Sequence, residues 1–219
     1  MTWIKICGMT NLKDTLTAVD AGADAVGFVF HEKSPRCVSV ETAREIVEKL
    51  PERTDKVGVF VDAPVRAARD VFHRAGLTAV QVYTESIAEW LAWYGSEEIK
   101  LMWAIPASIL KGDFFISLGT SKKEITALLV DSGPTDRPGG TGRRFDWDGA
   151  KAGIRHLSSM VPVVVAGGLT PENVNDAMKA LAPWGVDVVS GVEARPGKKD
   201  PEKVRAFVKA VRDSDRKVN

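Results

Sequence analysis

The segment WIKICGMT, residues 3–10, opens the chain and decides how the rest is interpreted. It predicts a short, mostly apolar strand that ends on Cys7, a bend at Gly8, and a helix cap at Thr10 or Asn11. A side chain at the carboxyl end of a first buried strand lies where an α/β barrel carries its chemistry. Cysteine is also a common core residue, so this segment alone equally allows a packed, inert thiol.

A strand followed by a helix recurs along the whole chain. Apolar strands with few charges are predicted at residues 24–30, 56–61, 79–83, 99–105, 126–131, 161–166 and 186–189. Amphipathic helices are predicted at residues 11–21, 40–50, 64–75, 86–94, 146–158, 171–181 and 201–211. One more helix is expected within residues 107–123, which completes the series of strand–helix units.

This alternation predicts a parallel sheet whose strands are buried on both faces. The number of units favours closure into a single-domain (β/α)8 TIM barrel of the α/β class. An open, doubly wound sheet is the alternative, because one miscounted unit would favour it. The barrel is expected to span residues 1–212, with a charged tail at residues 213–219 that frays.

The composition argues against several classes of protein. The 219 residues include 30 basic and 29 acidic ones, so the net charge of +1 implies no general attraction to nucleic acid or an anionic membrane. No apolar run approaches the roughly 20 residues that cross a bilayer, and the first residues lack a signal-peptide pattern. Cys7 and Cys37 follow neither a metal spacing nor a disulfide framework. A reducing cytoplasm fits such a chain, as a monomer or a homodimer.

Two of the predicted strands end on residues that can transfer protons, Cys7 and Asp131. An aspartate at a strand end often serves only as a helix cap or a turn residue. Here Ser132, Gly133 and Pro134 follow, and no helix begins directly after them. We therefore expect a chemical role for Asp131.

Two glycine-containing loops favour a phosphate site. The seventh strand ends at Gly167 and Gly168, followed by Thr170 as a predicted helix cap and Pro171 at the first helical position. The eighth strand ends at Ser190 and Gly191. The loops after the last two strands form the recurrent phosphate site of such barrels. Tight turns are the alternative. No dinucleotide fingerprint follows a strand.

Three further features carry weaker signals. Arg36, beside Pro35 in the loop after the second strand, has a planar side chain that suits a carboxylate, although most surface arginines are only solvated. The Gly- and Pro-rich loop at residues 132–144, which contains Gly142, is either a lid or a long connection. The three histidines are scattered, so we expect no metal site.

Together these segments resemble the phosphoribosylanthranilate isomerase family of tryptophan biosynthesis. The likeness covers nearly the whole chain, and the opening KICG with the later GGTG is specific as a set. It is carried by residues 5–10, 27–30, 34–36, 58–61, 129–132, 139–142, 145–147, 166–169 and 190–193.

The resemblance implies a barrel enzyme that converts a phosphoribosyl aminoaldose to an aminoketose by an Amadori rearrangement, without a metal or a cofactor. It implies that Asp131 is the general acid at the ring oxygen and that Cys7 is the general base at C2. Arg36 is expected to hold the anthranilate carboxylate. Backbone amides near the glycines of the last two loops are expected to hold the phosphate; the residues in question are Gly167, Gly168, Ser190 and Gly191. Further substrate contacts are expected from Gln81 and Gly142.

These two roles set requirements on the pKa values of Cys7 and Asp131. A thiol with an ordinary pKa of about 8.5 needs a lower one to act as a base near neutrality, and a nearby positive charge can lower it. Lys5 lies two residues before Cys7, so the two side chains share one face of the strand. Asp131 needs the opposite shift, a raised pKa, to keep its proton, and burial raises the pKa of a carboxyl group.

One segment departs from the family pattern. The fourth strand of the family ends in Gln-Leu-His-Gly, whereas this chain reads Gln81-Val82-Tyr83-Thr84. The glutamine is kept, but the histidine and the glycine are lost. The acid–base pair is intact, yet that wall of the pocket must meet the substrate differently.

Two other functions compete with this interpretation. The related isomerase of histidine biosynthesis shares the barrel and the chemistry, but it usually has an aspartate where Cys7 stands. A barrel that binds a phosphorylated ligand without catalysis is also compatible with the fold. Such a binder would need neither Cys7 nor Asp131.

Overall fold

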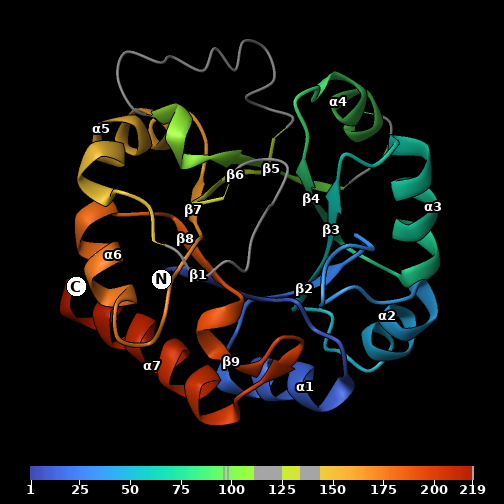
Figure 1. Ribbon diagram of the computed structural model, residues 1–219, viewed down its shortest axis with the longest axis horizontal. Helices are drawn as coiled ribbons and strands as arrows, with labels where there is room; N and C mark the ends of the chain where they lie inside the picture. Colours follow the sequence, from blue (N-terminus) through green and yellow to red (C-terminus); the bar gives the residue numbers. More distant parts are fainter. Residues whose placement is uncertain (96, 98, 111–124, 134–143, 219) are drawn as a thin grey trace.

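Eight parallel strands close into a barrel with helices around it (Figure 1). The structure is a computed structural model that describes residues 1–95, 97, 99–110, 125–133 and 144–218. Neighbouring strands follow the chain order from β1 to β8, and β8 pairs with β1. The predicted (β/α)8 barrel is therefore confirmed, and the open sheet is excluded.

The elements of the barrel have the following bounds. The strands are β1 (Trp3–Cys7), β2 (Ala25–Val29), β3 (Asp55–Val61), β4 (Ala79–Tyr83), β5 (Lys100–Pro106), β6 (Ala127–Asp131), β7 (Val163–Val165) and β8 (Gly185–Val188). The helices are α1 (Leu12–Ala21), α2 (Val40–Val47), α3 (Val65–Ala75), α4 (Ala88–Tyr94), α5 (Trp147–Ser158), α6 (Val174–Leu181) and α7 (Pro201–Val218). Two 3₁₀ turns, η1 (Ala107–Leu110) and η3 (Ser190–Val192), and a small hairpin of β9 (Glu193–Arg195) with β10 (Lys198–Lys199) complete the described part. In that part no helix is long and apolar enough to cross a membrane.

The sheet separates two apolar layers. Successive side chains of a strand point to opposite faces, so Ile4 and Ile6 of β1 pack between the sheet and the helices. Lys5 and Cys7 lie on the other face, and Cys7 packs inside the barrel with small and medium-sized residues of the other strands. Both faces are covered, which explains the near-continuous apolar strands of the sequence.

The first helix begins where the sequence indicated. The Asn11 side chain accepts a hydrogen bond from the backbone N–H of Asp14 at 3.0 Å, which satisfies one of the free donors of α1. The helix ends at Gly22, whose φ of 100° is the left-handed conformation that favours glycine. Both ends of the helix are thus specified locally.

Helix α6 begins three residues later than predicted. The expected cap at Thr170 and first position at Pro171 are wrong, because residues 171–173 form a turn and α6 starts at Val174. Asn173 explains the difference. Its Oδ1 accepts a hydrogen bond from the Thr170 N–H at 2.8 Å, and its Nδ2 donates to the Gly168 carbonyl at 2.8 Å.

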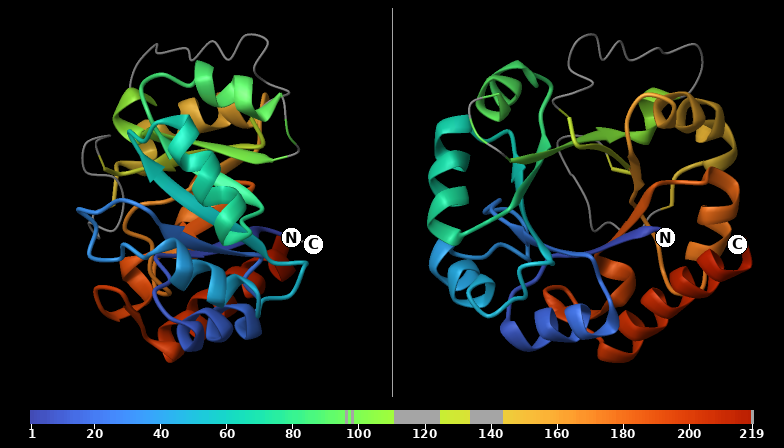
Figure 2. Two further views of the ribbon diagram at one scale, coloured as in Figure 1. Left: turned by 90° about the vertical axis from the view of Figure 1, so that its right-hand side faces the viewer. Right: turned by 180° about the vertical axis from the view of Figure 1, so that it is seen from behind.

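The closing helix is longer than predicted, since α7 continues to Val218 where a frayed tail from residue 213 was expected. Asp215 accepts hydrogen bonds from the Thr2 backbone N–H at 3.0 Å and from the Thr2 hydroxyl at 2.6 Å. Arg212 pairs with Asp24 at 2.8 Å. These contacts hold the two ends of the chain side by side (Figure 2). The helix expected within residues 107–123 is represented by η1; residues 111–124 lie outside the described part.

One ion pair inside the barrel provides a test of this fold. The Nζ of Lys5 lies 2.8 Å from Oδ1 of Asp187, and the two side chains are 0% and 4% exposed. Lys5→Met would leave the carboxyl group of Asp187 buried without its partner, so we expect the free energy of unfolding to fall by about 3–5 kcal/mol. Urea denaturation of the variant measures this loss.

Arg44→Ala is the matched control, because the Arg44–Glu48 pair is exposed on α2. Exposed ion pairs of this kind contribute little to stability, so the control should unfold at the same urea concentration as the wild type. A Lys5→Met midpoint equal to that of the control would contradict the stabilising role of the buried pair.

Candidate active site

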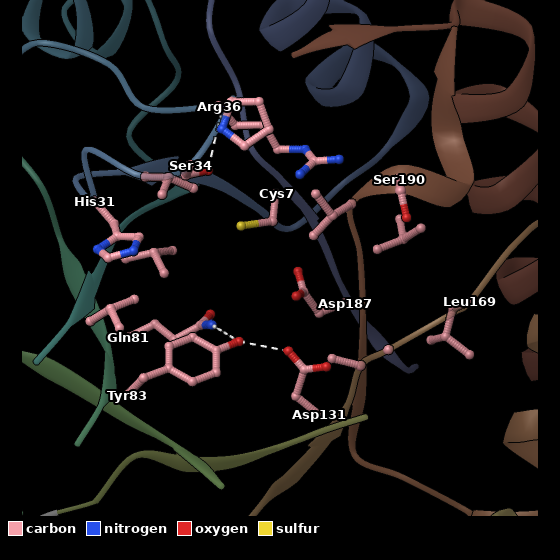
Figure 3. Close-up of a pocket in the computed structure, with 18 of the residues that line it drawn as sticks. Cys7, His31, Ser34, Arg36, Gln81, Tyr83, Asp131, Leu169, Asp187 and Ser190 are labelled. Atoms are coloured by element: carbon pink, nitrogen blue, oxygen red, sulfur yellow. Dashed lines mark hydrogen bonds between the residues drawn. The ribbon is translucent and has the colours of Figure 1, made fainter. Parts of the chain in front are cut away.

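A pocket of about 620 Å³ opens at the carboxyl ends of the strands. Figure 3 shows the side chains that line it, from β1 at the top to β4 and β6 at the bottom. The predicted site residues that line this pocket are Cys7, Arg36, Gln81, Asp131, Gly167, Gly168 and Ser190. Gly191 lies beside it, and Gly142 lies outside the described residues.

The thiol of Cys7 is placed by a glycine on the neighbouring strand. Cys7 is the last residue of β1 and pairs in register with Gly27 of β2. A Cβ atom on Gly27 would lie 2.5 Å from the Cys7 Sγ, so any side chain there would displace the sulfur. The thiol is 3% exposed but borders the pocket, which resolves the choice between an enclosed core cysteine and one that faces a cavity.

The positive charge of Lys5 lowers the pKa of the Cys7 thiol, as its place on the strand suggested, but burial has the larger effect and the pKa is raised. Asp187, which holds the Lys5 ammonium at 2.8 Å, adds a negative charge near the sulfur that raises this pKa further. Although burial acts to lower the pKa of Lys5, Asp187 and Cys7 raise it, so the lysine stays charged.

Asp131 is the last residue of β6, and one of its two carboxyl oxygens accepts two hydrogen bonds. Its Oδ1 accepts hydrogen bonds from the Gly133 backbone N–H at 3.2 Å and the Ser132 hydroxyl at 3.3 Å. Its Oδ2 accepts one from the Tyr83 hydroxyl at 2.8 Å. The aspartate therefore forms the turn that its position allowed and also presents an oxygen to the pocket (Figure 3).

Tyr83, which stands where the family has a histidine, contacts Asp131 directly. The Nε2 of Gln81 donates to the Tyr83 hydroxyl oxygen at 3.2 Å, which continues the chain of hydrogen bonds to Asp131. The Oε1 of Gln81 is buried and has no hydrogen-bond partner among the described residues. The sequence left the role of Tyr83 open, and the structure places it against the predicted acid.

Arg36 is buried and paired instead of solvated. Its Nε and Nη2 donate to the two carboxylate oxygens of Glu193 at 2.8 and 2.7 Å. Lys199 donates to the same carboxylate at 3.2 Å. The third nitrogen of Arg36, Nη1, has no partner in the part of the chain that is described, so it is available to an anion in the pocket.

Gly167 and Gly191 allow the loops after β6, β7 and β8 to pack closely against one another. Gly167 has a φ of 83°, and a Cβ there would lie 2.4 Å from the Ser132 hydroxyl oxygen. A Cβ on Gly191 would lie 1.9 Å from the carbonyl oxygen of Leu169, so this position permits only glycine. Gly191 therefore acts by close packing, and Ser190 is the residue of that loop that borders the pocket.

Two charged residues of the site were missed in the sequence. Asp187 is a single acid within the apolar strand β8, and such a residue in a doubly covered strand is a signal that could have found it. Glu193 gave no such signal, because its partner Arg36 lies 157 positions away in the chain. Only the closed barrel brings the two together.

The fold and the pocket define a class of protein, a (β/α)8-barrel enzyme whose pocket at the strand ends is lined by a thiol and a carboxyl group, side chains of the kinds that can transfer protons. Within the described residues, no group of three or more histidine, cysteine or acidic side chains is arranged to hold a metal ion.

Comparison with known proteins gives the particular family. The family model for N-(5'-phosphoribosyl)anthranilate (PRA) isomerase matches residues 4–210. The enzyme of that name from Pelobacter propionicus is 40% identical over 217 residues, which are 98% of this chain and 97% of the relative. The crystal structure of phosphoribosyl anthranilate isomerase from Thermotoga maritima has a TM-score of 0.83 and 37% identity, and covers 97% of this chain and 100% of its own.

A further crystal structure of the same isomerase contains reduced 1-(o-carboxyphenylamino)-1-deoxyribulose 5-phosphate. It has a TM-score of 0.77 and 36% identity, over 97% of this chain and 100% of that one. The chain belongs to the N-(5'-phosphoribosyl)anthranilate isomerase family, as the sequence motifs indicated.

The raised pKa of Cys7 predicts when the thiolate forms. Because burial raises this pKa, the thiolate fraction at neutral pH is small and grows as the pH rises, with a midpoint above the ordinary value of about 8.5. The measurement is the ultraviolet absorbance of the thiolate as a function of pH in Cys37→Ser. The Cys7→Ser/Cys37→Ser double variant supplies the baseline, and a midpoint below pH 8 would contradict the dominance of burial.

Proposed function

We propose that the chain catalyses the Amadori rearrangement of N-(5'-phosphoribosyl)anthranilate to 1-(2-carboxyphenylamino)-1-deoxyribulose 5-phosphate in tryptophan biosynthesis. The observation that carries the proposal is that Cys7 and Asp131, a potential base and a potential acid, line one pocket beside the glycine loops of β7 and β8. The family membership supports the same reaction, an aldose–ketose isomerisation.

The two proton-transfer groups have distinct tasks in this proposal. Asp131 gives its proton to the furanose ring oxygen as the C1–O bond breaks, which leaves a protonated Schiff base. The Cys7 thiolate then removes the proton from C2, and the resulting enolamine becomes the ketone. Lys5, which stays charged, favours the thiolate against the cost of burial.

The substrate's two anionic groups have different partners. The Nη1 of Arg36 is free to bind the anthranilate carboxylate while Glu193 fixes the rest of the guanidinium group. The phosphate is assigned to the loops that contain Gly167, Gly168 and Ser190, which border the pocket. The unpaired Oε1 of the pocket residue Gln81 can accept a hydrogen bond from a substrate N–H or O–H group.

A working thiol also bears on where the protein acts. Cys7 and Cys37 are both free, and a thiolate base requires that Cys7 stay reduced. This supports a reducing cytoplasm as the compartment. The expected contact from Gly142 belongs to the same proposal, although that residue lies outside the described part.

The competing functions are less well supported. The relatives from Pelobacter propionicus and Citrifermentans bemidjiense, which match over nearly the whole chain, are both named N-(5'-phosphoribosyl)anthranilate isomerase, which favours this substrate over that of histidine biosynthesis. A barrel that only binds a ligand has no use for a buried thiol and carboxyl group at one pocket.

Removing either proton-transfer group should stop the chemistry. We expect Cys7→Ala and Asp131→Asn each to lower kcat by about 10²- to 10⁴-fold, the usual share of general acid–base catalysis, with KM little changed. Turnover is followed by the loss of substrate fluorescence. Cys37→Ala is the matched control and should keep full activity, because Cys37 is exposed outside the pocket. A wild-type rate in either pocket variant would remove its assigned role.

Arg36 should act in binding more than in chemistry. Arg36→Ala removes a charged donor to the carboxylate, and we expect KM to rise about tenfold or more while kcat changes less. The KM of Arg36→Lys should lie between those of the wild type and Arg36→Ala, because lysine keeps the charge facing Glu193 but loses the planar guanidinium group. Steady-state kinetics measure both constants, with thermal unfolding as a check on folding. An effect confined to kcat would show that Arg36 does not bind the substrate.

A further inference from the structure

Three hydrogen bonds define the orientation of the Asp131 carboxyl group. Oδ1 accepts two, from Gly133 and Ser132, and Oδ2 accepts one, from Tyr83 at 2.8 Å. A carboxylate has about four lone-pair positions, two on each oxygen. Among the described residues, Oδ2 thus keeps one unoccupied position, and that oxygen belongs to a residue that lines the pocket.

The direction of the hydrogen bond from Tyr83 is also determined. Gln81 Nε2 can only donate, and it lies 3.2 Å from the Tyr83 hydroxyl oxygen, so that oxygen accepts from Gln81. The single proton of the hydroxyl is then left to point at Asp131. In Figure 3 the three side chains form a continuous row along the lower wall of the pocket.

The surroundings keep the Tyr83 hydroxyl protonated, so it can donate a hydrogen bond. Burial, followed by the negative charge of Asp131, raises the pKa of Tyr83 well above its ordinary value, so the phenol keeps its proton. Asp187 on β8 and Cys7 on β1 act in the same direction. Lys5 is the cation paired with Asp187, at 2.8 Å.

We propose that Tyr83 is a positioning residue for the reaction, whose hydroxyl holds the Asp131 carboxyl group so that one site on Oδ2 faces the substrate and carries the transferred proton. This rests on the proposed role of Asp131 as the general acid. It gives a task to the residue where the chain departs from the family histidine. Gln81 supports it by orienting the phenol, to which its Nε2 donates at 3.2 Å.

The test is the kinetics of Tyr83→Phe, which removes one oxygen atom and keeps the ring. We expect kcat to fall about tenfold to a hundredfold, as for the loss of a hydrogen bond to the carboxylate charge that develops while the proton leaves Asp131, with KM within about threefold of the wild type. Tyr83→His offers an N–H donor again and should recover most of the lost kcat. Tyr94→Phe is the matched control, because the other tyrosine of the chain lies on α4 outside the pocket lining.

Several outcomes would overturn the proposal. They are an unchanged kcat in Tyr83→Phe, a loss confined to KM, and a Tyr83→His variant as slow as Tyr83→Phe. Tyr83→Phe added to Asp131→Asn should cause no further loss of kcat, because the group that Tyr83 positions no longer transfers a proton; an additive loss would contradict the inference. Thermal unfolding monitors each variant, and Tyr83→Met replaces the phenylalanine variant if the latter does not fold.

The same experiments separate the two proposals. If Asp131→Asn is fully active, the assigned role of Asp131 is wrong, whatever Tyr83 does. If Asp131→Asn is inactive and Tyr83→Phe turns over like the wild type, only the positioning role of Tyr83 is wrong.

Discussion

The ion pair of Lys5 and Asp187 stands at the seam where the barrel closes. The two residues are register partners of β1 and β8, the first and last strands, and are 182 positions apart in the chain. A slip of β8 by one residue in this pairing would turn Asp187 to the opposite face of the sheet, into the apolar layer under the helices, and separate it from Lys5. The pair therefore fixes the register that brings Cys7 level with the other strand ends.

Closure also sets the chemical conditions of the pocket. The thiol, the carboxyl group of Asp131 and the arginine are all withdrawn from water. Asp131 and Arg36 are each held by a partner from a distant part of the chain, and so is Lys5, the cation beside the thiol. Burial favours the neutral thiol, so the charge of Lys5 is needed to make a thiolate accessible at all. The same low exposure makes hydrogen bonds to Asp131 strong enough to orient it. A thiol and a carboxyl group therefore share one cavity while each has different neighbours.

Much of the fold could be predicted from the sequence, because its signals are local. Apolar strands, the Asn11 cap and the glycine at the end of α1 act within a few residues, and each is where the pattern placed it. The errors have a common cause. The late start of α6 depends on the Asn173 side chain, and the length of α7 depends on contacts with Thr2 at the other end of the chain. Side chains that bind distant backbone groups leave no periodic pattern.

For the site, the sequence by itself determined which chemical groups are present and that strand ends carry them: Cys7, Asp131, Arg36 and the glycine loops. It also gave the family, since those motifs occur in one order. Only the tertiary structure decided their partners and charge states, namely Asp187 for Lys5, Glu193 for Arg36 and Tyr83 for Asp131. The physical reason is that electrostatic effects depend on distance and burial in space, and the closed barrel creates both between residues that are remote in the chain.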